Sequence, residues 1–417
     1  MITFWVNEFK HFYGLRPNDS FRFEYKHGCP SYFHELFLLY GIEFEVKTIR
    51  QDTPDPNVCN ICLIPAQGMP TKNYHLGQIT GAAIEAKEDI FWCYDNNIKV
   101  VIDRSREQAP YQIYDMIEYL DKEGLIDYSF FRILVMHKGP KDYYPIPAKE
   151  FYDSLIIDSE FYLYEMGGMS HNFIKSDKLD KLNISGSKYS ETAKKYSFIS
   201  MFGEMRKPQR LIIAQTLYKK AMLDSAFWTS LKRYSDELIK ANFQTEINKF
   251  IAKYGQSVYD YLTIERQFDS GKLNNASDRI IPEQCYQSYF YLGVESSFKW
   301  NLYSEKSYKP IALGMPFVIF GNPMFNHSFF TEHGYEKYDE LFDYDLFEVD
   351  TDVFGKETFT QLQNHSDKFV DGIEKALDQS LYTKELNDKC QHNRELLLNS
   401  TTKDKFMIFI EEVFDSW

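Results

Sequence analysis

Short apolar runs alternate with stretches of helical spacing in the N-terminal part of the chain. Apolar and charged residues alternate over 42–47, and β-branched residues fill 98–102, which is typical of strands. Gly41 follows a run of helical spacing, where glycine commonly ends a helix. Strands that alternate with helices indicate βαβ units and a mostly parallel sheet. Strands are predicted at 21–25, 42–47, 58–64, 98–102, 131–136 and 155–158, and helices at 31–40, 77–86 and 111–122.

A polar stretch separates this pattern from a second one of the same kind. Residues 167–195 are rich in Ser, Asn and Lys and are predicted to form a linker and surface loop. A new apolar strand is predicted at 196–202, with a one-sided helix behind it at 209–223. The apolar face of that helix is predicted to contain Leu211, Ala214, Tyr218, Ala221 and Met222. Later predicted elements are a polar helical insertion at 231–270, a strand at 289–294, and helices at 355–378 and 400–417.

Length and charge narrow the class of protein. A chain of 417 residues favours two domains, and the predicted fold class is α/β with Rossmann-like domains at 1–185 and 186–399. The net charge of −14 lowers the expectation of duplex binding, because proteins that bind duplexes usually present a basic face. Basic pairs at 194–195, 219–220 and 232–233 could still supply such a face.

Cysteine usage and hydropathy indicate in which cellular compartment the protein is expected. Cys59 and Cys62 form a C-x-x-C motif inside an apolar run, and a zinc site would need a second pair, so a structural role is predicted. No apolar run approaches the roughly 20 residues that cross a bilayer, and no apolar leader precedes Asn7. We therefore expect a cytoplasmic protein, in the host cytoplasm if the gene is viral, without a membrane partner.

The most informative segment is 284–323. It predicts a strand end, a polar loop, a short helix and a buried strand closed by a turn. Acids, hydroxyls and a lysine gather where the N-terminus of that helix would face a ligand. Cations and free N–H groups suit a diphosphate, and a carboxylate suits a ribose. The segment contains Glu295-Ser296-Ser297, Ser304-Glu305-Lys306, Lys309-Pro310-Ile311 and Met315-Pro316-Phe317, and ends at Gly321-Asn322-Pro323.

This segment resembles the donor-binding segment of GT-B glycosyltransferases, most closely the exostosin-like and fucosyltransferase-like enzymes and their bacteriophage relatives. The shared pattern is a Glu before a Ser/Thr-Glu-Lys triplet, then Lys-Pro-Ile and a strand with Pro-Phe and Gly. The run from Gly334 to Asp343 is similar to the end of that pattern. Many relatives have Thr or Asn where this chain has Ser296. The resemblance implies two facing Rossmann-like domains with a cleft between them, and a C-terminal helix at 400–417 that packs back on the first.

A cationic turn lies between the predicted strand at 196–202 and the next helix. Cations at a helix N-terminus oppose the helix dipole at a cost of a few tenths of a kcal/mol each. A bound anion would offset that cost. The resemblance implies that Arg206 and Arg210 contact the donor diphosphate, with Lys207 between them. The alternative is a solvated turn.

The resemblance also assigns the later polar residues. It implies that Glu305 approaches the donor ribose, that Lys306 approaches a phosphate, and that Glu295 faces the sugar or organises its loop. Ser296 would add a hydroxyl contact. The alternatives are an exposed helix start with Ser304 as its N-cap and a surface ion pair for Glu295.

A base for the acceptor hydroxyl is expected in the first domain if the enzyme inverts configuration. Asp103 follows the strand predicted at 98–102, where a parallel sheet opens its ligand crevice. Its placement resembles that of the base in a phage DNA β-glucosyltransferase. Glu107 is the second candidate. An N-cap or an ion pair with Arg104 or Arg106 is the alternative for Asp103, and the sequence does not distinguish retention from inversion.

The remaining polar motifs carry less chemistry. Scattered histidines (His34, His75, His137 and His171) are interpreted as satisfied polar residues. D-x-D strings occur at 343–345 and 350–352. Such strings hold a metal in the other glycosyltransferase fold, whereas GT-B enzymes usually neutralise the diphosphate with cations and helix dipoles. We expect no essential metal and no tightly bound cofactor.

The expected function is transfer of a sugar from a UDP- or GDP-sugar to a hydroxyl acceptor. The acceptor would be a glycan or, for a phage enzyme of DNA modification, a hydroxymethylated base in DNA. The alternative is a chain that retains the fold, has lost turnover and acts as a binding or assembly protein.

Overall fold

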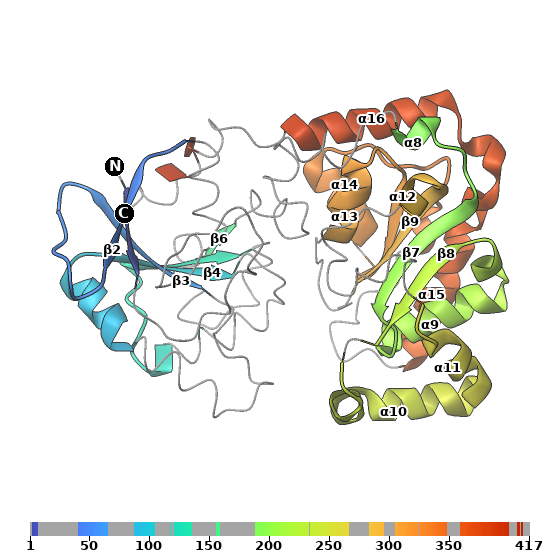
Figure 1. Cartoon of the computed structure of the whole chain (residues 1–417), viewed down its shortest axis with the longest axis horizontal. Coiled ribbons are helices and arrows are strands. Elements are labelled where there is room, and N and C mark those ends of the chain that lie inside the picture. The colour runs from blue at the N-terminus through green and yellow to red at the C-terminus, as the bar shows by residue number, and fades with distance from the viewer. Residues whose placement is uncertain are drawn as a thin grey trace. The chain divides into compact units, whose positions relative to one another are not determined.

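The chain divides into two compact units, and its two ends belong to the same unit (Figure 1). Unit 1 comprises Met1–Met166 with Thr401–Trp417, and unit 2 comprises Gly167–Ser400. The structure is a computed structural model, and it describes residues 2–6, 41–65, 87–104, 117, 121–135, 156–158, 188–232, 234–266, 283–295, 305–323, 325–347, 359–399, 407–408 and 410–411.

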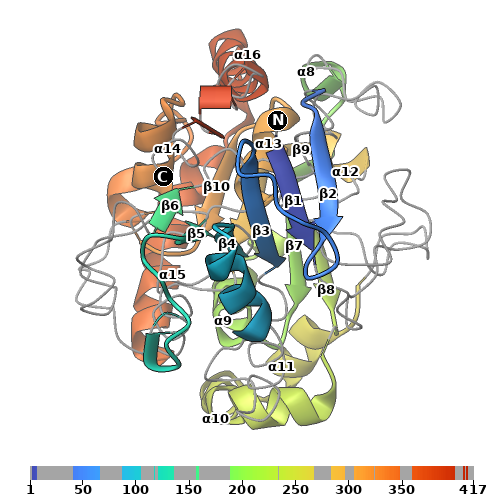
Figure 2. The same ribbon diagram turned by 90° about the vertical axis from the view of Figure 1, so that its left-hand side faces the viewer.

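Unit 1 contains a six-stranded sheet in which every neighbouring pair of strands is parallel (Figure 2). The strand order is β2-β1-β3-β4-β5-β6, so the direction of winding reverses between β1 and β3. This order is that of a doubly wound α/β fold. The strands are β1 (Ile2–Val6), β2 (Phe44–Thr48), β3 (Cys59–Pro65), β4 (Lys99–Arg104), β5 (Phe131–Val135) and β6 (Ile156–Asp158).

The core of unit 1 is organised around Trp5, which is fully buried in β1. Its indole N–H donates to Oδ1 of Asn60 (2.8 Å). The amide nitrogen of Asn60 donates to the carbonyls of Asp55 (2.8 Å) and Val58 (3.0 Å), which ties the turn before β3 to β1. The Trp5 ring also lies 5.5 Å from the ring of Trp92 in the helix at 87–95. One buried side chain thus joins two strands and a covering helix.

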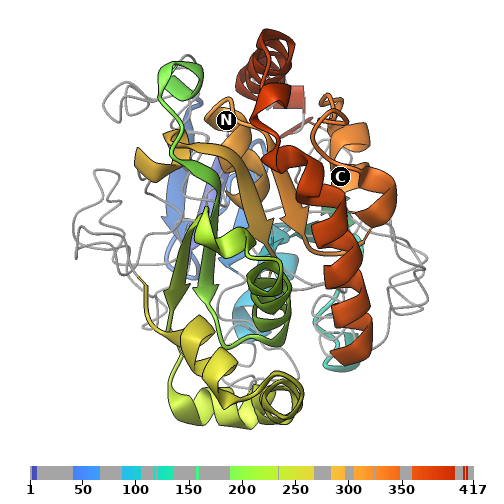
Figure 3. The ribbon, with the colours of Figure 1, turned by 90° about the vertical axis from the view of Figure 1, so that its right-hand side faces the viewer.

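Unit 2 contains a four-stranded parallel sheet in the order β10-β9-β7-β8 (Figure 3). The winding reverses between β7 and β9, as it does between β1 and β3 in unit 1. Side chains of β9 and β10 are almost all buried on both sides, which requires helices on both faces of the sheet. The strands are β7 (Tyr196–Glu204), β8 (Phe227–Leu231), β9 (Ser288–Val294) and β10 (Phe317–Phe320).

Two helices that connect neighbouring strands cover the faces of this sheet. Helix α9 (Pro208–Lys219) joins β7 to β8, and α13 (Glu305–Ala312) joins β9 to β10. Because these right-handed crossovers run in opposite directions across the sheet, the two helices cover opposite faces. Helix α9 packs against α15 (Phe359–Ile373), and α13 packs against α16 (Lys384–Asn399).

Shorter and peripheral helices complete unit 2. The remaining α-helices are α8 (Lys188–Glu191), α10 (Asp236–Tyr254), α11 (Gln256–Thr263), α12 (Glu283–Tyr286) and α14 (Phe325–His333). The 3₁₀ turns are η4 (Met222–Asp224), η5 (Tyr344–Phe347), η6 (Glu374–Leu377) and η7 (Gln379–Leu381).

An asparagine completes the hydrogen bonding of strand β10. Oδ1 of Asn326 accepts the N–H of Ile319 (3.0 Å), and its amide nitrogen donates to the carbonyl of the same residue (2.9 Å). Asn393 makes the same pair of bonds to the backbone of Glu336 (2.8 and 2.9 Å). Both asparagines are buried. The Asn326 carboxamide therefore stands in for the backbone of a neighbouring strand, so that the Ile319 peptide groups are not buried without partners. The Asn393 carboxamide holds the loop at Glu336 through the same pair of bonds.

The sequence-based prediction of α/β class is confirmed, and eight strands lie where they were predicted or within two residues of it. The structure adds strands β1 and β8 and helices α14 and α16, which the pattern did not predict. The strand predicted at 21–25 and the helices predicted at 31–40 and 77–86 lie outside the described residues. The helical insertion predicted at 231–270 is present as α10 and α11.

Two local predictions were wrong. The end of the predicted linker at 167–195 forms helix α8, in which Tyr189 is buried. The helix predicted at 209–223 is not one-sided: residues 211–217 of α9 are all buried, whereas Tyr218 is 40% exposed. Ala221 lies beyond the helix in a left-handed turn and is exposed. The sheet on one side and α10, α11 and α15 on the others enclose α9, so its sequence needs no polar face.

Candidate functional site

The carboxyl edge of the sheet in unit 2 is the place where this fold offers a binding site. In doubly wound sheets, ligands bind beyond the carboxyl ends of the strands at the point where the winding reverses. In unit 2 that point lies between β7 and β9. Strand β7 ends at Glu204, and β9 ends one residue before Glu295. Charged residues predicted to bind a donor follow both strands.

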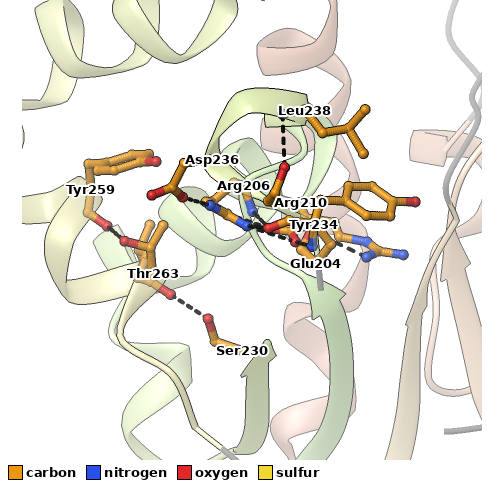
Figure 4. A network of polar contacts seen from close by, with 11 residues as sticks. Glu204, Arg206, Arg210, Ser230, Tyr234, Asp236, Leu238, Tyr259 and Thr263 are labelled. Atoms are coloured by element: carbon orange, nitrogen blue, oxygen red, sulfur yellow. Dashed lines mark hydrogen bonds and ion pairs between the residues drawn. The ribbon is translucent and has the colours of Figure 1, made fainter. Parts of the chain in front are cut away.

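A buried ion pair joins the loop after β7 to the loop after β8 (Figure 4). Nε of Arg206 donates to Oε1 of Glu204 (2.7 Å), and its Nη2 donates to Oε2 (3.1 Å). Nη1 donates to Oδ1 of Asp236 (2.6 Å), and Nη2 also donates to the carbonyl of Tyr234. The backbone N–H of Tyr234 in turn donates to Oε2 of Glu204 (2.8 Å). The pair fixes the whole turn between β8 and α10.

Electrostatics agree with this geometry. Burial would raise the pKa of Glu204, but the hydrogen bonds from Arg206 and from the Tyr234 N–H outweigh it and hold that pKa below its ordinary value. The hydrogen bond to Glu204 raises the pKa of Arg206. Because the pKa of the acid is depressed, the pair contributes stability above the ordinary pKa of a glutamate and loses it as the pH falls through the lowered pKa. Arg206 is thus best explained as a residue that positions the loop.

Arg210 has a different environment, although it lies only four positions further along the chain, in the first turn of α9. Its guanidinium lies over Gly203, and a Cβ at that position would be 2.9 Å from Nη1. Gly203 has a φ of 58°, which favours glycine, and it falls in the irregular register of β7 between Met201 and Glu204. Nη1 of Arg210 donates to the Glu204 carbonyl (3.3 Å). Figure 4 shows this guanidinium extending away from the Glu204–Arg206 pair. The bulge at Gly203 therefore makes room for a cation at the end of β7.

A second charged pair lies at the end of β9. Oε2 of Glu295, which is 1% exposed, lies 3.2 Å from Nζ of Lys306 in the first turn of α13. Glycines allow the close packing around this pair. A Cβ at Gly293 would be 3.2 Å from Cβ of Lys306, and one at Gly321 would be 3.4 Å from Cβ of Glu295. These contacts fix α13 against the ends of β9 and β10.

The two charged groups lie at the same edge of the sheet. Ile199 of β7 pairs with Tyr291 of β9, and four residues further on the strands reach Gly203 and Glu295. Adjacent strands are about 4.8 Å apart. Arg210 and the Glu295–Lys306 pair therefore lie at neighbouring strand ends, on either side of the reversal point. Two cations there suit a phosphate group, and a carboxylate suits a sugar hydroxyl.

Other predicted site residues are placed only in part. Lys207 is the N-cap residue of α9, and Nζ lies 5.4 Å from the centre of the Tyr234 ring. Glu305 begins α13, but its side chain lies outside the described part, as do Ser296, Ser304 and Glu107. The catalytic role of Glu107 therefore stays a prediction.

Asp103 lies inside a strand and not after one as predicted. It is the penultimate residue of β4, and its neighbours in the sheet are Pro65 and Leu134. Because β4 is parallel to both neighbours, Asp103 is near the carboxyl edge of the sheet in unit 1. Its side chain is not among the described ones. Its role as a base stays a prediction.

Three residues of the network were missed by the sequence interpretation: Glu204, Tyr234 and Asp236. Glu204 was part of the cationic turn but received no role. Tyr234 and Asp236 follow β8, which was not predicted, so nothing in the pattern placed them beside β7. The available signal was a run of cations next to an acid directly after a strand, which favours an internal ion pair as much as a ligand.

Two of the basic residues considered for nucleic acid have internal partners. Nζ of Lys194 donates to the carbonyls of Tyr189 (2.5 Å) and Tyr286 (2.8 Å), and burial lowers the pKa of Lys194 to about 7. Lys220 forms ion pairs with Asp371 and Glu374. These two lysines therefore contribute little to a phosphate-binding surface.

Comparison with family models and with curated proteins identified no relative of this chain. No protein-family model matches the chain, and no curated protein matches it in sequence. Within the described segments, no group of three or more His, Cys, Asp or Glu side chains is placed to hold a metal ion. None of the helices described combines the length and apolar composition that a membrane span needs.

Buried His365 supports the end of β10 beside this site. Its ring stacks on Phe320 at 4.9 Å, and its Nε2 donates to the carbonyl of Gly321 (3.1 Å). Burial, which disfavours the charged ring, lowers the pKa of His365 from 6.5 to about 4. Between those values the unfolded chain takes up a proton that the folded chain excludes. The contribution of His365 is complete above pH 6.5 and falls by about 3 kcal/mol as the pH drops to 4.

We expect the free energy of unfolding of the His365→Gln variant to depend less on pH between 6.5 and 4 than that of the wild type. Urea titrations at a series of pH values measure this difference. Equal pH dependence of wild type and His365→Gln would contradict the assignment.

Proposed function

We propose that the chain is a glycosyltransferase that transfers a sugar from a UDP- or GDP-sugar to a hydroxyl acceptor. The observation that carries the proposal is the placement of Arg210 and the Glu295–Lys306 pair at neighbouring strand ends, at the reversal point of a doubly wound sheet. Cations at that point suit a diphosphate, because their positive charges attract its negatively charged oxygens.

The roles of the residues follow from their chemistry. Arg210 and Lys306 neutralise the charge that develops on the leaving diphosphate, and Lys207 adds charge at the start of α9. Glu295 organises its loop and keeps Lys306 in place. Glu305 accepts the ribose hydroxyls, and the Ser296 and Ser304 hydroxyls complete the donor contacts. The attraction between such cations and the diphosphate becomes stronger as water is excluded from the site.

The acceptor side of the proposal rests on the resemblance. Two Rossmann-like domains face each other in the GT-B arrangement, and Asp103, with Glu107 as the second candidate, takes the proton of the acceptor hydroxyl. The acceptor is a glycan or a hydroxymethylated DNA base. The internal partners of Lys194 and Lys220 favour the glycan. A DNA acceptor would be recognised by binding that weakens steeply with salt.

A donor panel tests the proposal. UDP, GDP and their common sugar conjugates are added to the purified protein, and the thermal unfolding midpoint is followed. A donor at 100 times its Kd should stabilise the folded chain by about 2.7 kcal/mol. Lys306→Gln keeps an N–H for Glu295 but removes the charge, so the affinity should fall about tenfold or more.

Lys188 offers a matched control for this experiment. It forms an ion pair with Glu283 at 3.1 Å, and its side chain is 21% exposed, close to the 3.2 Å and 13% of Lys306. Lys188 lies before β7, at the amino edge of the same sheet. Lys188→Gln should therefore bind donor as the wild type does. The proposal fails if no nucleotide stabilises the wild type, or if both variants lose affinity equally.

A further inference from the structure

An exposed aromatic ring stands at the carboxyl edge of the sheet in unit 2. Tyr234 is 38% exposed, and it lies between the end of β8 at Leu231 and the start of α10 at Asp236. Strand β8 is the neighbour of β7, on the side away from β9. Tyr234 thus belongs to the same edge as Arg210, one strand further along.

The backbone of Tyr234 is fixed more firmly than an exposed loop residue requires. Both its N–H and its carbonyl are bound by the buried Glu204–Arg206 pair. The next residue, Ser235, caps α10 by accepting the N–H of Leu238 (3.3 Å). Buried ion pairs are weak sources of net stability, and their best attested use is to specify geometry. The geometry specified here is the position of the Tyr234 ring.

The ring shares its surroundings with cations of the proposed donor site. Nζ of Lys207 lies 5.4 Å from the ring centre. Figure 4 shows the Tyr234 ring and the Arg210 guanidinium extending to the same side of the Glu204–Arg206 pair. A phosphate held by Arg210 would therefore have a flat aromatic surface beside it, on the side opposite Glu295 and Lys306.

The strand order then fixes the direction of a bound donor. From β9 through β7 to β8 there are two strand spacings, about 10 Å. A ribose bound near α13 and a diphosphate bound at Arg210 direct the remaining end of the molecule toward β8. That end is the sugar to be transferred. Aromatic rings commonly line carbohydrate sites, because their faces pack against apolar C–H surfaces while the tyrosine hydroxyl stays in water.

We propose that Tyr234 is a positioning residue that stacks on the ring of the transferred sugar. This inference rests on the proposed transferase function and adds that the donor carries a pyranose with an apolar C–H face. The sugar lies against the tyrosine, and the Glu204–Arg206 pair keeps the tyrosine in place. Tyr234 therefore discriminates a nucleotide-sugar from the nucleotide alone.

Calorimetric titration with paired ligands tests this inference. UDP-glucose, UDP-N-acetylglucosamine, GDP-mannose and GDP-fucose are each compared with UDP or GDP. For the nucleotide-sugar that the wild type binds, Tyr234→Ala should lower the affinity about five- to tenfold. Its affinity for the free nucleotide should stay within about twofold of the wild-type value. Tyr234→Phe should retain wild-type affinity, because it keeps the ring. Tyr218→Ala, which removes a similarly exposed tyrosine, is the control.

The outcomes separate the two proposals. If wild type binds neither nucleotides nor their sugar conjugates, the transferase proposal fails and takes this inference with it. If wild type binds a nucleotide-sugar and Tyr234→Ala binds it equally well, the inference fails while the transferase proposal stands. Equal weakening of nucleotide and nucleotide-sugar would also overturn it, because the ring would then contact the nucleotide.

Discussion

Replacing Arg206 by methionine is expected to lower the free energy of unfolding of unit 2 by about 3–5 kcal/mol. The reason is the carboxylate left behind. Glu204 is 1% exposed, and Arg206 supplies two of its hydrogen bonds and its countercharge. Asp236 loses little, because its side chain is 80% exposed. Native-state hydrogen exchange in peptides that cover β7 and β8 measures the change.

A double variant distinguishes the unpaired charge from lost packing. Glu204→Leu with Arg206→Met removes both charges, so it should be more stable than Arg206→Met alone. The same exchange experiment should show faster exchange in the turn around Tyr234, because the pair no longer holds its N–H. A cost below about 1 kcal/mol for Arg206→Met, which is typical of exposed pairs, would contradict the structural role.

Replacing Asn326 by leucine is expected to cost about 2–5 kcal/mol. Leucine has a similar size but leaves the N–H and carbonyl of Ile319 without the partners that Asn326 supplies. Each buried backbone group without a partner costs about 1–3 kcal/mol. Chemical denaturation gives the total effect, and the exchange rate of the Ile319 amide locates it.

Asn242 is the comparison for that experiment. Its amide nitrogen donates to the carbonyl of Leu238 (2.7 Å), but the residue is exposed on α10. Asn242→Leu should therefore change stability by less than about 0.5 kcal/mol. If the two leucine variants were equally stable, Asn326 would not be completing the strand.

Strong local patterns allowed most of the sheet order to be anticipated. The strand, helix and strand predicted within 284–323 are present as β9, α13 and β10, because a buried parallel strand needs an apolar run and the helix between needs polar signals at its start. Strands β1 and β8 were missed although, with five residues each, they are no shorter than β6 and β10, which were predicted. Their strand character comes from pairing with β3 or β7, which no local pattern contains.

The candidate site was predictable in its composition but not in its partners. Arg206 and Arg210 occur in the same cationic turn and look equivalent in the sequence. The structure separates them because β8 brings Asp236 and Tyr234 to Arg206, while the bulge at Gly203 directs Arg210 elsewhere. The partner of Glu295 lies nearer in the sequence, since Lys306 is at the start of the next helix. Residues distant in the sequence therefore determine which of the two arginines forms a buried ion pair within the protein.

A crystal structure with a UDP- or GDP-sugar that stabilises the protein is the most direct test of the central claim. The account predicts diphosphate oxygens about 3 Å from the guanidinium of Arg210 and the ammonium of Lys306, at the carboxyl edge of the sheet in unit 2. A nucleotide bound away from these two cations, or at the amino edge near Lys188, would contradict it.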